Sequence, residues 1–142
     1  MTIEALFSTL NLLAIAGWLL LIAAPRDRRA IATAGTVIPA LLSGTYLVLL
    51  ALHIRESHGG FSSLRAVAQL FSNPWLLLAG WVHYLAFDLL VGTWETTDAD
   101  ARGISKWVVL PCLVLTFLFG PIGWLSYQVV RNTAPGRQRG PR

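Results

Sequence analysis

Apolar residues dominate four long stretches of the chain, at about residues 3–24, 31–52, 74–92 and 104–130. Each stretch approaches or exceeds the roughly 20 residues that a helix needs to cross a lipid bilayer. Inside a bilayer, backbone N–H and C=O groups need partners within their own segment, so the stretches are expected to be helices. The pattern therefore predicts an all-α, multi-pass integral membrane protein whose four transmembrane helices form a bundle.

The segments between and after these stretches predict the remaining organisation. In the connection 53–73, the sequence "FSSLRAVAQLF" repeats apolar residues at helical spacing, which predicts a short amphipathic interfacial helix between helices two and three. The segment "TWETTDADARGISKW" predicts a polar loop, and "FGPIGW" predicts a bend or break near residues 120–121 of the fourth helix. Residues 1–131 form the predicted transmembrane domain, and residues 132–142 a disordered basic tail.

Composition and charge support this class and exclude others. Of the 142 residues, 55% are hydrophobic, above the globular norm of about 45–50%, and the mean hydropathy is +0.60. The first stretch follows an acidic "MTIE" segment and is too long for a signal peptide, so it is interpreted as a retained helix. The net charge of +4 comes from bases at the ends of the stretches, which favours membrane lipids over nucleic acid as partners. These bases divide six to five between the two predicted sides, so the orientation stays open.

The segment "HYLAFDLLVGTWE" places ionisable side chains within the third apolar stretch. Placing Asp88 at the bilayer centre would cost about 2.5–3.5 kcal/mol of insertion free energy. Its position six residues before Trp94 predicts a depth of about 9 Å below the membrane interface that Trp94 marks. At about 100° per residue, Tyr84, Asp88 and Glu95 share one helix face, whereas His83 lies roughly 140° away from Asp88. Ionisable residues within a membrane are functional candidates, so this face is the predicted site.

Two other interpretations of the polar residues stay open. A salt bridge would satisfy the Asp88 carboxylate without any chemistry, and its candidate partners are Arg26, Arg28, Arg102 and Lys106. In "HIRESH", the side chains of His53, Glu56 and His58 are of metal-binding types, but their spacing does not match the usual zinc-hydrolase motifs. We expect these three residues on the opposite side from Asp88. Neither a metal nor a cofactor is predicted.

Three segments together resemble a known family. The sequence "WVHYLAFDLLVGTWE", followed by "ARGIS" and "LTFLFGPIGWLSY", is similar to the abscisic-acid-deficient-four family of plants, which is associated with neoxanthin synthesis, and to its bacterial relatives. The resemblance implies a four-span protein that acts on carotenoids, since the plant members help to convert violaxanthin, an epoxide, into neoxanthin, an allene. The chain shows no transit peptide, which favours a bacterial-type member in an inner membrane.

The resemblance and the charged segment lead to one functional hypothesis. Opening an epoxide to an allene needs an acid at the oxygen and a base at a carbon-bound hydrogen, so Asp88 is the predicted acid and His83 or Glu95 its partner. A long polyene is expected to lie against the aromatic side chains of Trp81, Tyr84, Phe87 and Trp94. Two alternatives are a non-catalytic binder of a carotenoid or other isoprenoid and a small structural partner of another membrane protein. Homo-oligomer formation is left open.

Overall fold

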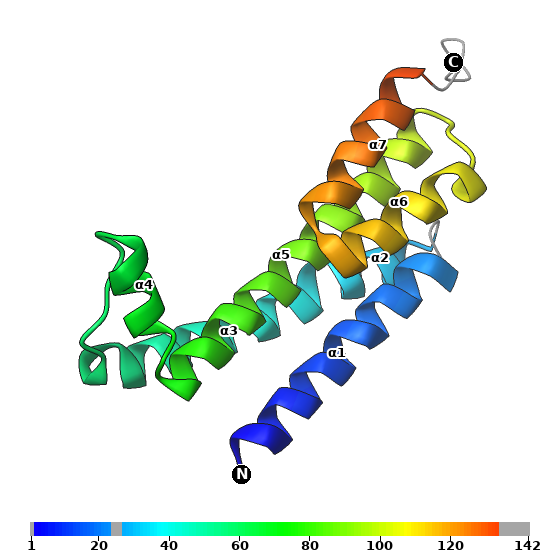
Figure 1. The fold of residues 1–142 in the computed structure, drawn as a ribbon. Helices are drawn as coiled ribbons and strands as arrows, with labels where there is room; N and C mark the ends of the chain where they lie inside the picture. The colour runs from blue at the N-terminus through cyan, green and yellow to red at the C-terminus, as the bar shows by residue number, and fades with distance from the viewer. Residues whose placement is uncertain (1, 24–26, 134–142) are drawn as a thin grey trace.

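The computed structural model describes residues 2–23 and 27–133, and every regular element in these ranges is helical, as predicted (Figure 1). In chain order the elements are α1 (Ile3–Ala23), α2 (Arg28–Ala32), the π-helical turn η1 (Thr33–Val37), α3 (Ile38–His53), the 3₁₀ turn η2 (Ile54–Glu56), α4 (Leu64–Leu70), α5 (Pro74–Ala101), α6 (Lys106–Phe119) and α7 (Pro121–Thr133).

Three helical segments are long and apolar enough to cross a membrane: α1, the continuous segment from Arg28 to Glu56, and α5. The continuous segment joins α2, η1, α3 and η2, and it begins where the Asp27 side chain accepts a 2.8 Å hydrogen bond from the Ala30 N–H. Its π-helical turn lies just before Pro39, which has no N–H and crowds the preceding turn. The wider π turn lets the helix continue through this proline without ending.

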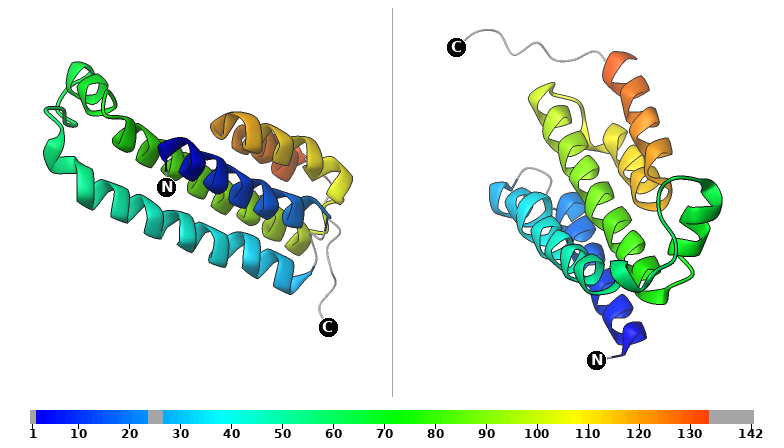
Figure 2. Two further views of the ribbon diagram at one scale, coloured as in Figure 1. Left: turned by 90° about the horizontal axis from the view of Figure 1, so that it is seen from below. Right: turned by 90° about the vertical axis from the view of Figure 1, so that its left-hand side faces the viewer.

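The α5 helix lies in the middle of the bundle, in contact with α1, α3, α6 and α7 (Figure 2). Close approach to α1 depends on two glycines, because a side chain at Gly17 would meet Leu89 and one at Gly92 would meet Trp18. α5 continues to Ala101, so the polar loop predicted to begin at residue 93 is wrong as far as residue 101.

The extension of α5 places Asp88 near the middle of this helix. Polar side chains in this part find partners within the bundle, as when the buried Thr96 hydroxyl donates to the Gly92 carbonyl. Asp88 is the fifteenth of the 28 residues of α5 and lies about 20 Å from either end of the helix.

The fourth apolar stretch is divided into two helices that fold back on each other. α6 ends at Phe119, Gly120 has a φ of +48°, and α7 begins at Pro121, which confirms the predicted break. The helices α6 and α7 pack side by side over one half of α5, and their turn lies near its middle (Figures 1 and 2). In the described residues, three helices of spanning length and one helical hairpin therefore replace the predicted four spans.

The hairpin places the two ends of the described chain, residues 2 and 133, at opposite ends of the bundle. The described chain starts near the end that carries α4, here called the α4 end, and α7 finishes near the α5–α6 connection, the α5–α6 end (Figure 1). The predicted short helix in the connection 53–73 exists as α4, in which the Ser63 hydroxyl caps the Ala66 N–H. Residues 132–133 belong to α7 and not to a tail; the rest of the predicted disordered tail, residues 134–142, lies outside the described residues.

Candidate functional site

Asp88 is buried beneath the turn of the α6–α7 hairpin. Its side chain is 9% exposed and lies against Gly120, where an added Cβ would be 2.8 Å from Oδ1. The Tyr84 side chain lies one turn earlier on the same face of α5, and its hydroxyl lies 3.5 Å from the Phe117 carbonyl of α6. Oδ2 of Asp88 is buried and has no hydrogen-bond partner within the described residues. A buried polar atom without a partner is costly, which makes it a candidate contact for a ligand.

Glu95 lies on the same face of α5, two turns beyond Asp88, and is fully buried. The Thr116 hydroxyl of α6 lies 2.9 Å from Oε1 and 3.1 Å from Oε2 of this carboxylate. Gly123 of α7 leaves room for this contact, because a side chain there would overlap the Thr116 backbone. The predicted shared face of Tyr84, Asp88 and Glu95 is thus the face that the hairpin covers.

A third acidic residue on α5 holds α7 in place. Oδ2 of Asp98 accepts hydrogen bonds from Arg102 Nε at 2.8 Å, Arg131 Nε at 2.9 Å and the Tyr127 hydroxyl at 2.7 Å. The Arg131 guanidinium also lies 5.6 Å from the centre of the Trp94 ring. The sequence placed Asp98 in a loop, and no local pattern pairs it with residues about 30 positions later.

The remaining predicted site residues are spread over other surfaces. His83 is exposed and packs against the rings of Tyr46 at 5.6 Å and Phe87 at 4.6 Å, on another part of the α5 surface from Asp88. Phe87 is itself 55% exposed. Trp94 packs edge-on against Tyr127 at 5.5 Å, at the α7 contact. Of the four predicted aromatic residues, only Tyr84 lies next to Asp88 along the same face of α5, and the Trp81 ring packs against Tyr84 at 5.3 Å.

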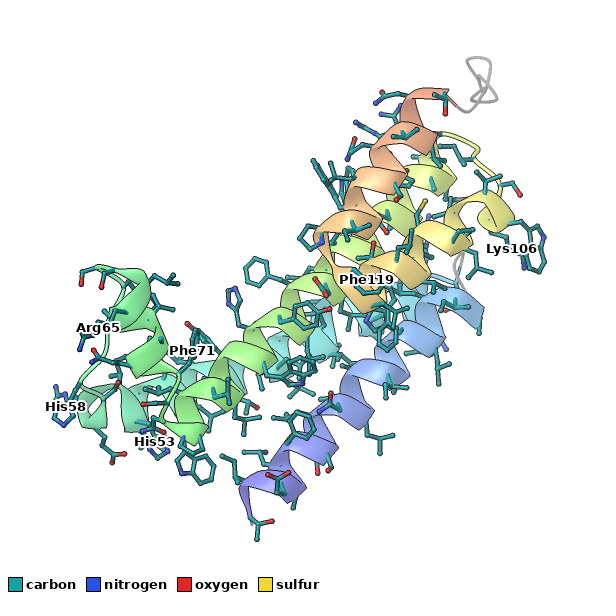
Figure 3. All side chains as sticks on the ribbon, in the orientation of Figure 1. His53, His58, Arg65, Phe71, Lys106 and Phe119 are labelled. Atoms are coloured by element: carbon teal, nitrogen blue, oxygen red, sulfur yellow. The ribbon has the colours of Figure 1, made fainter. Side chains whose placement is uncertain are left out.

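The salt-bridge and metal interpretations are not supported within the described residues. Asp88 forms no ion pair there with Arg28, Arg102 or Lys106, and Arg102 pairs with Asp98 instead; Arg26 lies outside the described residues. His53 Nδ1 lies 3.1 Å from Glu56 Oε2, and the imidazole stacks on Trp75. His53 and His58 lie at the α4 end, far from Lys106 (Figure 3), and no group of three metal-binding side chains occurs in residues 2–23 and 27–133.

Two cavities lie at opposite ends of the bundle, and Asp88 lines neither. The first has a volume of about 400 Å³ and lies between the first turns of α1 and α5 at the α4 end; it is lined by Ile3, Glu4, Phe7, Pro74, Leu77, Leu78 and Trp81. The second has a volume of about 160 Å³ and lies between α1, α5 and α6 at the α5–α6 end. Since Trp81 lines the first cavity and contacts Tyr84, an aromatic path leads from that cavity towards Asp88.

A comparison with protein families identifies the relationship of the chain. A family model described as ABA DEFICIENT 4-like matches residues 5–127. The chain belongs to the ABA DEFICIENT 4-like family. No curated protein and no solved structure gives a match.

The structure brings together the segments that carry the ABA DEFICIENT 4-like resemblance. The "HYLAFD" segment supplies Tyr84 and Asp88 from α5, and the "FGPIG" segment supplies Gly120 at the hairpin turn, where the two meet. Thr116 from "LTFLFG" contacts Glu95, which lies two turns beyond Asp88 on the same face of α5. In this ABA DEFICIENT 4-like protein, residues that are about 30 positions apart therefore form one buried acidic site.

Proposed function

We propose that this chain is a membrane-embedded protein that binds a carotenoid or related isoprenoid and isomerises it by acid–base chemistry at Asp88. The observation that carries the proposal is the buried carboxyl oxygen of Asp88, which has no partner among the described residues and lies at the turn of a helical hairpin. Family membership and three apolar helices of spanning length support a membrane protein. The resemblance to the plant neoxanthin family supports the substrate class.

The arrangement of α5 and the hairpin supports entry of an oily substrate from the side. The α6–α7 hairpin covers only one half of α5, and the groove lined by Phe7, Leu77 and Trp81 lies on the other half. From Trp81 the aromatic contacts continue to Tyr84, which lies one turn from Asp88 on the same face of α5. A polyene in the α1–α5 groove would lie with one end at the hairpin turn, where Phe119 is exposed (Figure 3).

The proposed reaction needs one carboxyl group in two protonation states. Protonated Asp88 donates its proton to an oxygen or carbon of the substrate, and for an epoxide the ring C–O bond breaks with its electrons going to oxygen. The Asp88 carboxylate then removes a proton from the neighbouring carbon, and the C–H electrons form the new double bond. The product has the same mass as the substrate, Asp88 is regenerated, and no oxidant or cofactor is consumed.

The structure favours Asp88 over the other candidates for the second proton transfer. His83 lies on another part of the α5 surface, and Glu95 lies about 10 Å further along the helix with its two oxygens contacting Thr116. Glu95 is accordingly proposed as a positioning group that holds α6 against α5 and keeps the hairpin turn over Asp88.

The pigment carried by the purified protein tests the proposal. We expect protein from a carotenoid-producing host to be coloured and its extracted pigment to include an isomer with the mass of the host carotenoid but a changed spectrum and retention time. A bound but unaltered pigment would instead support the non-catalytic binder, which the aromatic groove at Trp81 also favours. A colourless preparation that contains a stoichiometric protein partner would contradict both and support a structural role.

The hairpin also predicts the orientation in the membrane. Because α7 returns to the α5–α6 end, the described bases are five at this end and two at the α4 end: Arg28, Arg29, Arg102, Lys106 and Arg131 against Arg55 and Arg65. Connections rich in Lys and Arg stay on the cytoplasmic side, so we expect the α5–α6 end to face the cytoplasm.

Thiol labelling can measure this orientation. In a Cys112→Ala background, a membrane-impermeant maleimide should label Ser62→Cys, in the exposed connection at the α4 end, in intact bacterial cells. Ser105→Cys, exposed at the α5–α6 end, should react only after the cells are permeabilised. The opposite pattern, or equal labelling of both variants in intact cells, would contradict the proposed orientation.

A further inference from the structure

The smaller cavity, at the α5–α6 end, has largely apolar walls, and its two charged lining residues are Lys106 and Asp100. Its volume is about 160 Å³, and it lies between the last turn of α1, the end of α5 and the first two turns of α6. Leu21, Val109, Leu110 and Leu113 are among the residues of the apolar wall, and Lys106 lies at the end where α6 begins (Figure 3). The cavity is distinct from the acidic site, because neither Asp88 nor Glu95 lines it.

The shape of this cavity follows one face of α6. Its lining residues Lys106, Leu110 and Leu113 are four and three positions apart, so they form a row along the helix of about 10 Å. Ala99 and Thr96 of α5 form the opposite wall, and the small Ala99 side chain leaves the space open. A row that runs along the helix axis matches an extended hydrocarbon chain that lies parallel to the helices.

The excess of described bases over acids at the α5–α6 end favours an anionic headgroup. Lys106 is exposed, and its Nζ lies 5.0 Å from the centre of the Trp107 ring, which is 70% exposed. Tryptophan and lysine side chains beside the first turn of a helix are typical of the headgroup level of a membrane. The five described bases named above make this end the more cationic one, with Asp27, Asp98 and Asp100 as its described acids.

We propose that this cavity is a binding site for an anionic phospholipid, with one acyl chain between α1, α5 and α6 and the phosphate at Lys106. The lipid fills the gap between the end of α1 and the hairpin, so it stabilises the packing of α6 against the rest of the bundle. This inference rests on the proposed membrane location and is independent of the proposed isomerisation at Asp88.

Native mass spectrometry of the detergent-purified protein tests the site. With added phosphatidylglycerol or phosphatidylcholine of identical acyl chains, we expect tighter binding of phosphatidylglycerol. Lys106→Ala should reduce this preference about fivefold, the effect of one lysine beside an anionic headgroup, and Leu110→Trp, which fills the cavity, should weaken both lipids. Arg65→Ala, which removes an exposed base at the α4 end, is the matched control and should change nothing.

The contradicting results are equally specific. Equal binding of the two lipids, or a preference that Lys106→Ala leaves unchanged while Arg65→Ala alters it, would overturn the proposed site. Competition by inorganic phosphate alone would show that the mouth binds a free anion without the acyl chain, which would also overturn it. Pigment analysis of the same Lys106→Ala protein separates the two proposals, since its isomer content should equal that of the unchanged protein.

Discussion

Replacing Asp88 with asparagine is expected to reduce isomerisation of an added carotenoid by about 100-fold or more, the scale of losing one general acid. Asparagine keeps the size and shape of the side chain that lies beneath Gly120, so the fold is expected to survive. The asparagine amide has no acidic proton to transfer to the substrate and forms no carboxylate to accept one back. Turnover measured by chromatography, together with circular dichroism of the variant, separates loss of chemistry from loss of structure.

Two control variants make this result specific. Glu56→Gln neutralises a carboxylate whose side chain is 62% exposed at the α4 end, so it should leave turnover unchanged. His83→Gln should also retain most of the turnover, because His83 contacts Tyr46 and Phe87 and not Asp88. Unchanged turnover in Asp88→Asn would remove this residue from the mechanism, and a loss in His83→Gln as large as that in Asp88→Asn would contradict the arrangement described above.

Replacing Gly123 with alanine is expected to cost about 3 kcal/mol or more of stability, the upper range for overpacking. The new Cβ would overlap the backbone nitrogen and Cα of Thr116, and these atoms cannot move unless α6 moves as a whole. Separation of α6 from α7 would also remove the contact between the Thr116 hydroxyl and Glu95 and expose the acidic site. Thermal unfolding of the detergent-solubilised protein, followed by tryptophan fluorescence, measures the loss.

Gly44 offers a matched control for this substitution. It also lies within a helix, but no atom lies within 4 Å of the position that its Cβ would occupy. Gly44→Ala should therefore be neutral or slightly stabilising, by up to about 1 kcal/mol, because alanine favours a helix more than glycine does. If Gly123→Ala were as mild as Gly44→Ala, the close packing of the hairpin would be wrong.

The chain contains enough local information to predict the helices. The lengths of its apolar stretches and their periodicity predicted an all-α protein, the short helix α4 and the break at Gly120. These features depend only on residues close together in the chain. A stretch of about 20 apolar residues favours a helix over its own length, and a Gly-Pro pair interrupts a helix at its own position. The shared face of Tyr84, Asp88 and Glu95 followed from the helical repeat for the same reason.

The partners of polar residues depended on the tertiary structure. Glu95 and Asp98 belong to a segment whose composition predicted a loop, because local propensity gives no account of partners on other helices. Only packing against α6 and α7 supplies Thr116, Tyr127 and Arg131, which satisfy the acidic groups and let α5 continue to Ala101.

By itself, the sequence determined the class of protein, the helical segments and the acidic face of α5. The tertiary structure decided that the fourth apolar stretch folds back on itself as a helical hairpin, because the glycine turn at Gly120 and the small Gly123 let α6 and α7 pack directly on each other. That packing, which joins positions far apart in the chain, buried Asp88 beneath the turn and placed Arg131 beside Asp98, at the end opposite α4.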